Sequence, residues 1–109
     1  MAQIGTFTRT PDGSGFGGAI RTLSLNVKVK IVSEAIKEND NAPDYRVFAT
    51  NGAELGAAWK KTGERAGEYL SVTIDDPSFA RPLYANLIRA ESDKDLYMLL
   101  WNRPQLKKD

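Results

Sequence analysis

The sequence predicts an all-β domain, an antiparallel meander of about seven or eight short strands that forms either a small barrel or a two-sheet sandwich. Three observations support this prediction. Apolar and polar residues alternate with a period of two along most of the chain. Turn-forming residues interrupt the alternation about every ten residues. The 109 residues, 41% of them hydrophobic, are enough for one domain with a single modest core over residues 1–109.

The first third of the chain is expected to hold two strands joined by a turn. The stretch "IGTFTRT" predicts the first strand, and Asp12 and Gly13 in "PDGSG" predict the turn. The stretch "TLSLNVKVKIV" then alternates strictly and predicts one long, half-buried strand. Its inner face would hold Leu23, Leu25, Val27, Val29 and Ile31, and its outer face Thr22, Ser24, Asn26, Lys28 and Lys30.

The middle of the chain predicts a loop and then a hairpin. "SEAIKENDNAP", residues 33–43, is polar and rich in residues that break strands, so it is expected to be a loop that holds at most one helical turn. "DYRVFA" and "ELGAAW" predict two short strands. Asn51 and Gly52 lie between them and give the strongest two-residue hairpin signal in the chain.

The last third predicts three strands separated by turns. "EYLSVTI" alternates and is followed by "DDPSF", in which Pro77 is placed for a tight turn. "PLYANLIRA" predicts the next strand, with Pro82 at its first position, and "ESDKD" predicts the turn after it. "LYMLLW" is apolar on both faces, so we expect a central strand or one that is covered on both sides.

The stretch "WKKTGERAGEYLSV", from Trp59 to Val72, predicts a hairpin whose register decides which side chains are buried. Pairing Trp59 with Glu68 would place Trp59 on one face with Leu70 and Val72. Slipping the pairing by one residue would instead place Trp59 beside Tyr69. The first register buries more apolar surface, so Trp59 is predicted to belong to the core.

Composition excludes several kinds of chemistry. The chain has no cysteine and no histidine, so it has no disulfide, no thiolate and no Ser-His or Cys-His nucleophile. An enzyme and a zinc site are therefore not expected. No membrane span or signal peptide is visible, so the cytoplasm is the expected location.

Two short motifs that suggest ligands are better explained by turns. "GSGFGG" matches the glycine spacing of dinucleotide-binding loops, but a strand pattern follows it where that loop requires a helix. The glycines are expected to serve a hairpin turn or a bulge, and no cofactor is predicted. Asp75 and Asp76 suggest a cation site, but Asp before Pro at a strand end is a common turn device, so no metal is predicted.

Basic residues and tyrosines between residues 46 and 84 leave two interpretations open. They can bind a phosphate backbone and stack bases, as single-strand binding proteins do, or they can simply keep a hairpin tip solvated. The net charge of +1 argues against a general attraction for nucleic acid. The candidate nucleic-acid-binding residues are Arg46, Lys60, Lys61, Arg65, Tyr69, Arg81 and Tyr84.

A protein-interaction module is the alternative. Residues 1–33 are basic and residues 34–54 are acidic, which favours a partner that recognises one face. Exposed strand edges pair readily with other strands. The partner would be another protein bound through a strand edge, or a second copy in a homodimer.

Several stretches resemble a small bacterial family of domains of unknown function (number 736). They are "APDYRVF", "GAAWK", "YLSV", "DDPSF" and "YANL", and the likeness covers nearly the whole chain. The resemblance implies a single-domain cytoplasmic protein that is often encoded on plasmids and integrative elements. It implies no activity.

Overall fold

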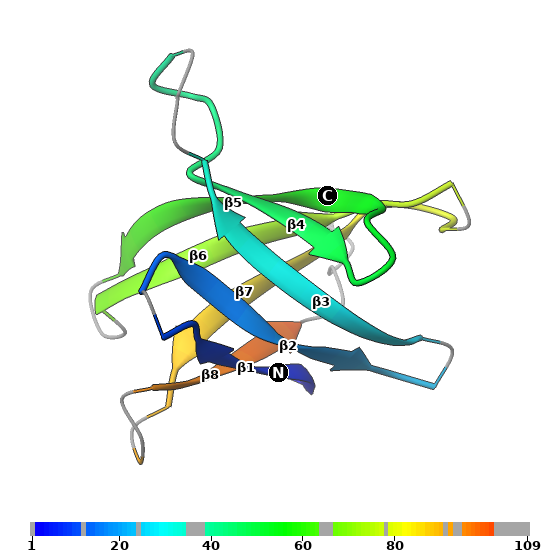
Figure 1. Ribbon diagram of the computed structural model, residues 1–109, viewed down its shortest axis with the longest axis horizontal. Coiled ribbons are helices and arrows are strands. Elements are labelled where there is room, and N and C mark those ends of the chain that lie inside the picture. The colour runs from blue at the N-terminus through cyan, green and yellow to red at the C-terminus, as the bar shows by residue number, and fades with distance from the viewer. Residues whose placement is uncertain are drawn as a thin grey trace, which may run out of the picture.

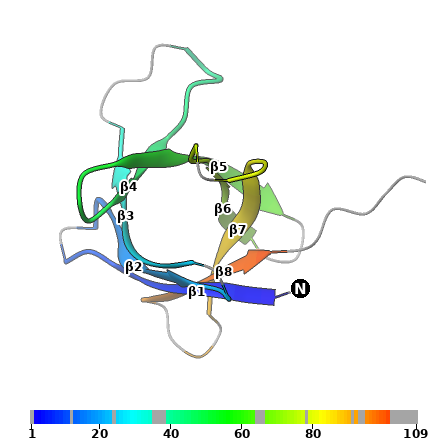
Figure 2. The same ribbon diagram turned by 90° about the vertical axis from the view of Figure 1, so that its right-hand side faces the viewer.

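The computed structural model describes residues 2–11, 13–23, 25–34, 39–63, 67–77, 79–90, 92 and 95–101. These residues form an antiparallel barrel, seen from the side in Figure 1 and end-on in Figure 2. No helix long and apolar enough to cross a membrane occurs in this part of the chain. The strands are β1 (Ala2–Arg9), β2 (Gly15–Arg21), β3 (Asn26–Ser33), β4 (Tyr45–Ala49), β5 (Glu54–Gly63), β6 (Gly67–Ile74), β7 (Leu83–Arg89) and β8 (Leu96–Trp101).

The barrel is an up-and-down meander in which each strand pairs with the next one along the chain. The first and last strands close the ring, because β1 pairs with β8 from Ala2 opposite Trp101 to Thr8 opposite Leu96. The all-β prediction is confirmed. Of the two predicted architectures, the structure is the barrel and not the sandwich.

Side chains that face into the barrel form one continuous apolar core. Alternate residues of each strand point inward, as the period of a β-strand requires. Each strand contributes to the core, for example Phe7 from β1, Leu87 from β7 and Leu99 from β8, which are at most 1% exposed. Among the described residues no polar or charged residue is buried. Burial of this apolar surface is the main source of stability.

The prediction of one long strand that begins at residue 22 is wrong for its first residues. The chain instead forms two strands, β2 and β3, joined by a hairpin at residues 22–25. The Thr22 amide donates to the Leu25 carbonyl (2.6 Å), and Thr22 Oγ1 accepts a hydrogen bond from the Leu25 amide (3.0 Å). Leu23 lies at the tip, fully exposed, and not on the inner face. A threonine hydroxyl stabilises this turn, so neither glycine nor proline marks it in the sequence.

The register predicted for the β5–β6 hairpin is also wrong. Trp59 pairs with Ser71, while Glu68 pairs with Thr62. In addition, β5 carries a β-bulge toward β4, where Val47 pairs with Gly56 and Phe48 pairs with Glu54. The extra residue, Leu55, is buried, and it breaks the alternation that would put Leu55 and Trp59 on the same face.

Trp59 consequently lies outside the core, half-buried on the outer face of β5. Its indole Nε1 donates a hydrogen bond to the Asn41 carbonyl (3.0 Å). This contact holds the connection between β3 and β4 against the barrel. The predicted loop at residues 33–43 begins with the last residue of β3, and its residues 35–38 lie outside the described part of the chain.

The remaining strand predictions are confirmed within a few residues. β4 and β5 meet at a turn in which Gly52 has a φ of 93°, a conformation that favours glycine. The predicted turn after β6 is present, because the Phe79 amide donates to the Asp76 carbonyl (2.8 Å). β8 pairs on both sides, with β1 and β7. Within the described chain no second layer covers its outer face, where Leu96, Met98 and Leu100 are half-buried.

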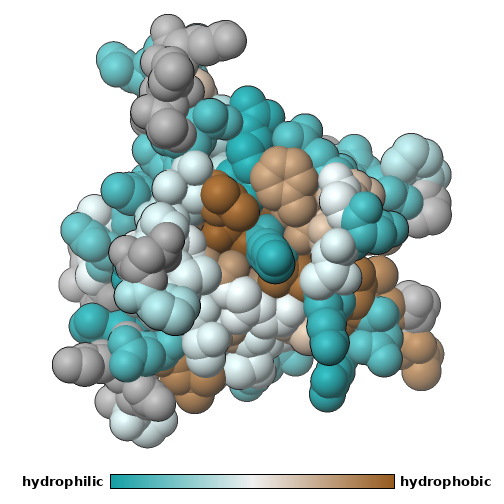
Figure 3. Space-filling view, viewed as in Figure 1, coloured by the Kyte–Doolittle hydropathy of each residue, from teal (hydrophilic) through white to brown (hydrophobic). Residues whose placement is uncertain are grey.

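The outer surface of β3 and β4 is mixed in polarity. Lys28, Lys30 and Val32 alternate outward on β3, and Val32 is 44% exposed. Figure 3 shows this face as small apolar areas between polar side chains. Such scattered apolar groups are normal for a protein surface and do not mark a site.

Candidate functional site at the open end of the barrel

The two ends of the barrel differ in how they are filled. One end carries the hairpin at residues 22–25 and the connection between β6 and β7. There the half-buried side chains of Leu25, Phe79, Leu83 and Trp101 pack against the core and cover it. At the other end the inward-facing positions carry charged and aromatic side chains, so the interior is open to solvent. We call this end the mouth.

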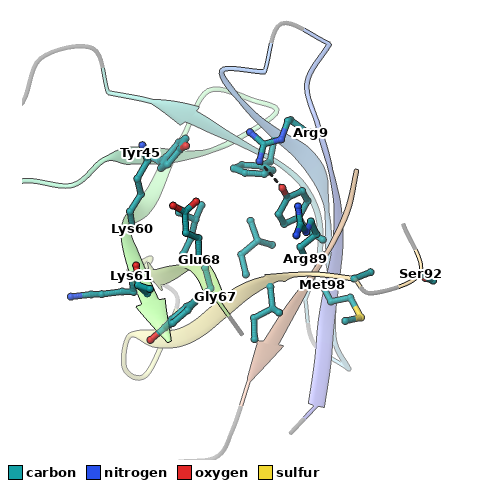
Figure 4. A pocket seen from close by; sticks show the side chains of 17 residues that line it. Arg9, Tyr45, Lys60, Lys61, Gly67, Glu68, Arg89, Ser92 and Met98 are labelled. Atoms are coloured by element: carbon teal, nitrogen blue, oxygen red, sulfur yellow. Dashed lines mark hydrogen bonds between the residues drawn. The ribbon is translucent and has the colours of Figure 1, made fainter. Parts of the chain in front are cut away.

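The mouth contains a cavity of about 1390 Å³. Figure 4 shows its lining side chains, which come from strands that are far apart in the sequence. Leu70 and Leu87 lie at its floor, where the apolar core begins. The inward-facing side chains around it are Arg9, Phe16, Tyr45, Lys60, Glu68, Arg89 and Tyr97.

Arginine and aromatic side chains form one wall of the mouth. Arg9 Nη2 donates a hydrogen bond to the Tyr97 hydroxyl (2.5 Å). Its guanidinium carbon lies 5.1 Å from the centre of the Phe16 ring and 5.4 Å from the centre of the Tyr97 ring. The two rings meet edge to face at 4.8 Å. These contacts hold Arg9 in a defined position.

Lys60 and Tyr45 form the opposite wall (Figure 4). Lys60 Nζ lies 5.9 Å from the centre of the Tyr45 ring, and the Lys60 amide donates to Asp44 Oδ2 (2.9 Å). Glu68 lies between this wall and the arginines. The Asp44 contact fixes the β5 backbone, so the ammonium group of Lys60 is held near the rim.

The rim of the mouth is open on one side, between β6 and β7. The last pair between these strands is Leu70 with Leu87, although β6 begins three residues earlier and β7 extends two residues further. The cavity reaches outward through this gap, because outward-facing side chains line it together with inward-facing ones. We call this gap the slot. The outward-facing residues beside it are Lys61, Tyr69, Ile88 and Met98.

The structure brings only some of the predicted site residues together. Lys60, Lys61 and Tyr69 all line the cavity, and Lys61 lies directly opposite Tyr69 on the outer face of the hairpin. Arg65 lies outside the described residues. Arg81 and Tyr84 lie near the start of β7, at the opposite end of the barrel.

Arg46 also lies away from the mouth, on the outer face of β4. Its Nε donates to Glu34 Oε2 at 2.8 Å, and its Nη1 lies 3.8 Å from Glu54 Oε1. Two carboxylates therefore compensate its charge. This ion pairing leaves it poorly suited to bind phosphate.

Sequence reasoning missed Arg9, Glu68 and Arg89. Arg9 and Arg89 end their strands and Glu68 is the second residue of β6, each at a position that alternation assigns to the inner face. Arg9 follows the inward residues Gly5 and Phe7, and Arg89 follows Ala85 and Leu87. The sequence signal for these three residues is a charged side chain at a position where the alternation of the strand predicts a buried one. This signal points to a site only when it is known that these strand ends meet at one rim.

The two motifs interpreted as turns are placed as follows. The glycines of "GSGFGG" contribute Gly13, with a φ of 76°, to the first hairpin, and then run into strand β2 and not into a helix. Asp75 and Asp76 lie in the turn after β6. Among the residues that the structure describes, no three acidic side chains gather to hold a metal ion.

A family model described as "Protein of unknown function (DUF736)" matches residues 3–104. The chain belongs to this family. The match extends from the second residue of β1 to beyond the end of β8, so it covers all of the barrel except Ala2. No curated protein and no solved structure matches the chain significantly. Its function is therefore argued from the mouth.

Proposed function

We propose that the protein is a non-enzymatic binding module that takes single-stranded nucleic acid at the mouth of its barrel. We place it in the bacterial cytoplasm, in the service of a mobile element, which is the setting that the family resemblance implies. One observation carries the binding proposal. Inward-facing positions that are apolar through the rest of the barrel become charged at the mouth, where three cations, Arg9, Lys60 and Arg89, outnumber one acid, Glu68.

The arrangement suits a flexible chain that carries both negative charge and flat rings. Single-strand binding proteins combine cationic side chains that follow the backbone with aromatic side chains on which bases stack. Lys60 and Lys61 supply charge beside the half-exposed rings of Tyr45 and Tyr69. Because the net charge of +1 gives no general attraction for nucleic acid, the proposal depends on charge that is local to the mouth and screened over about 10 Å. Binding without catalysis accords with a chain that has neither His nor Cys.

Replacing both Lys60 and Lys61 with alanine is expected to weaken binding of a mixed-sequence single strand about tenfold at low salt. The slope of log affinity against log salt should fall by about 0.7 for each lysine that contacts a phosphate. Fluorescence anisotropy with a labelled oligonucleotide measures both quantities.

The matched control is the double variant Lys28→Ala, Lys30→Ala. It removes the same charge from the outer face of β3, away from the mouth. Equal losses in the two double variants would mean that net charge, and not the mouth, governs binding. An unchanged salt slope in the Lys60, Lys61 variant would remove those residues from the site.

The protein-interaction alternative now depends on the outer face of β8. Every strand of the barrel pairs on both sides, so the described chain offers no complete free strand edge. The outward side chains of Leu96, Met98 and Leu100 instead form an apolar row. A second copy of the chain is the partner that this alternative predicts.

If β8 mediates a homodimer, sedimentation velocity should show a dimer that dissociates when Met98 is replaced by lysine. The charged side chain would have to be buried at the interface, which is unfavourable. Val32→Lys, at an exposed apolar position on β3, should leave the dimer intact. A monomer at all concentrations would exclude this alternative.

A further inference from the structure

We infer that the arginine wall of the mouth binds a terminal phosphate of a nucleic acid strand, so that the protein recognises strand ends. This inference rests on the proposed function and specifies which part of the strand enters the cavity. The ligand group is a phosphomonoester, carried on either the 5′ or the 3′ end. Arg9, Tyr97 and Arg89 form the site.

The two arginines flank one tyrosine. Arg89 of β7 is the cross-strand partner of Tyr97 in β8, and Arg9 of β1 donates to the Tyr97 hydroxyl. Figure 4 shows Arg9 and Arg89 on the same wall, both directed into the cavity. Since Tyr97 neighbours both residues, the closure of the barrel places the two guanidinium groups on one wall of the cavity.

Neither arginine is paired with a carboxylate within the described part of the chain. Arg46 shows the contrasting case, with Glu34 and Glu54 at its guanidinium. Two positive charges on one wall that are not ion-paired repel each other, and an anion between them removes that repulsion. A guanidinium group presents parallel N–H donors that match the oxygens of a phosphate.

The cavity is closed at its floor, which favours a strand end over a strand interior. Leu70 and Leu87 end the cavity, and below them the barrel is filled by fully buried side chains such as Leu99 and Val72. A strand cannot pass through the barrel. It can enter with its end first and leave sideways through the slot, past Lys61 and Tyr69.

The charges of the cavity also distinguish a terminal phosphate from an internal one. A phosphomonoester carries about −1.5 to −2 charges near neutral pH, whereas an internal diester carries one. Two arginines therefore match the terminal group better. Glu68, which lies between the Lys60 wall and the arginines, repels a phosphate and so favours a position for it directly against Arg9 and Arg89.

The test uses the full chain and one mixed-sequence single strand with a fluorophore on an internal base. The strand is prepared with a 5′-phosphate, with a 3′-phosphate, or with hydroxyl groups at both ends. One phosphorylated form should bind about tenfold more tightly than the hydroxyl form, as expected for an added charge-assisted contact. The form preferred identifies the end that enters the cavity.

Arg89→Gln should abolish this preference while the hydroxyl-ended strand still binds. Arg89 is exposed and makes no ion pair with another described residue, so the variant should fold, which an unchanged melting temperature verifies. The matched control is Arg46→Gln on the outer face, which should retain the preference.

Equal affinity for all three strands, with Arg89→Gln weakening each equally, would overturn the terminal-phosphate inference and leave the proposed function standing. Failure of every strand to bind at low salt would instead reject the proposed function, and the inference with it.

Discussion

Replacing Gly18 with alanine is expected to lower the free energy of unfolding by about 2–3 kcal/mol, whereas the same change at Gly17 should alter it by less than about 1 kcal/mol. Both glycines lie in β2, but Gly18 faces inward. A Cβ atom at Gly18 would lie 2.1 Å from the Thr6 carbonyl oxygen and 2.8 Å from Phe7 Cα. Backbone atoms of β1 would have to move, and the barrel holds them in place.

Gly17 is the matched control because nothing lies within 4 Å of a Cβ atom built there. Alanine at this position adds a methyl group to open space. It also reduces the freedom of the unfolded chain, which acts in favour of the folded state. Chemical denaturation of the two variants measures the difference. Equal stability of Gly18→Ala and Gly17→Ala would show that β1 and β2 are not as closely packed as the structure has them.

Replacing Ile31 with alanine should cost about 2–5 kcal/mol, while Leu23→Ala should change stability by no more than about 0.5 kcal/mol. The two residues have the same parity in the sequence and were predicted to share one buried face. Ile31 is 1% exposed inside the barrel, but Leu23 is fully exposed at the tip of the hairpin between β2 and β3. Truncating Ile31 leaves a cavity, and truncating Leu23 leaves none.

Thermal or urea denaturation of both variants tests where β2 ends and β3 begins. Similar large losses of stability in the two variants would support the single long strand that the alternation alone predicts. A loss of stability only in Ile31→Ala would establish that Leu23 lies outside the core, although it has the same place in the sequence alternation as Ile31. Val29→Ala should behave like Ile31→Ala, because Val29 is buried beside it.

The candidate site could be predicted only where it lies within one hairpin. Lys60, Lys61 and Tyr69 belong to neighbouring strands, so their association follows from local pairing. Arg9 and Tyr97 are 88 residues apart in the sequence, and only the pairing of β1 with β8 brings them together. Arg46 and Tyr84 match the predicted site only by residue type. The ion pairs of Arg46 and the position of Tyr84 at the far end depend on tertiary structure.

The sequence by itself determined that the chain is a meander of short antiparallel strands, because alternation and turn residues are local properties of the chain. It also excluded chemistry that needs His or Cys. Only the tertiary structure decided that the ring closes, that Leu55 forms a bulge and that Trp59 faces outward. Closure depends on contact between the first and last strands, and the bulge and Trp59 depend on the register between neighbouring strands. One extra residue in a strand moves every later side chain to the other face. Closure also placed Arg9 of β1, Lys60 of β5 and Arg89 of β7 around one open mouth.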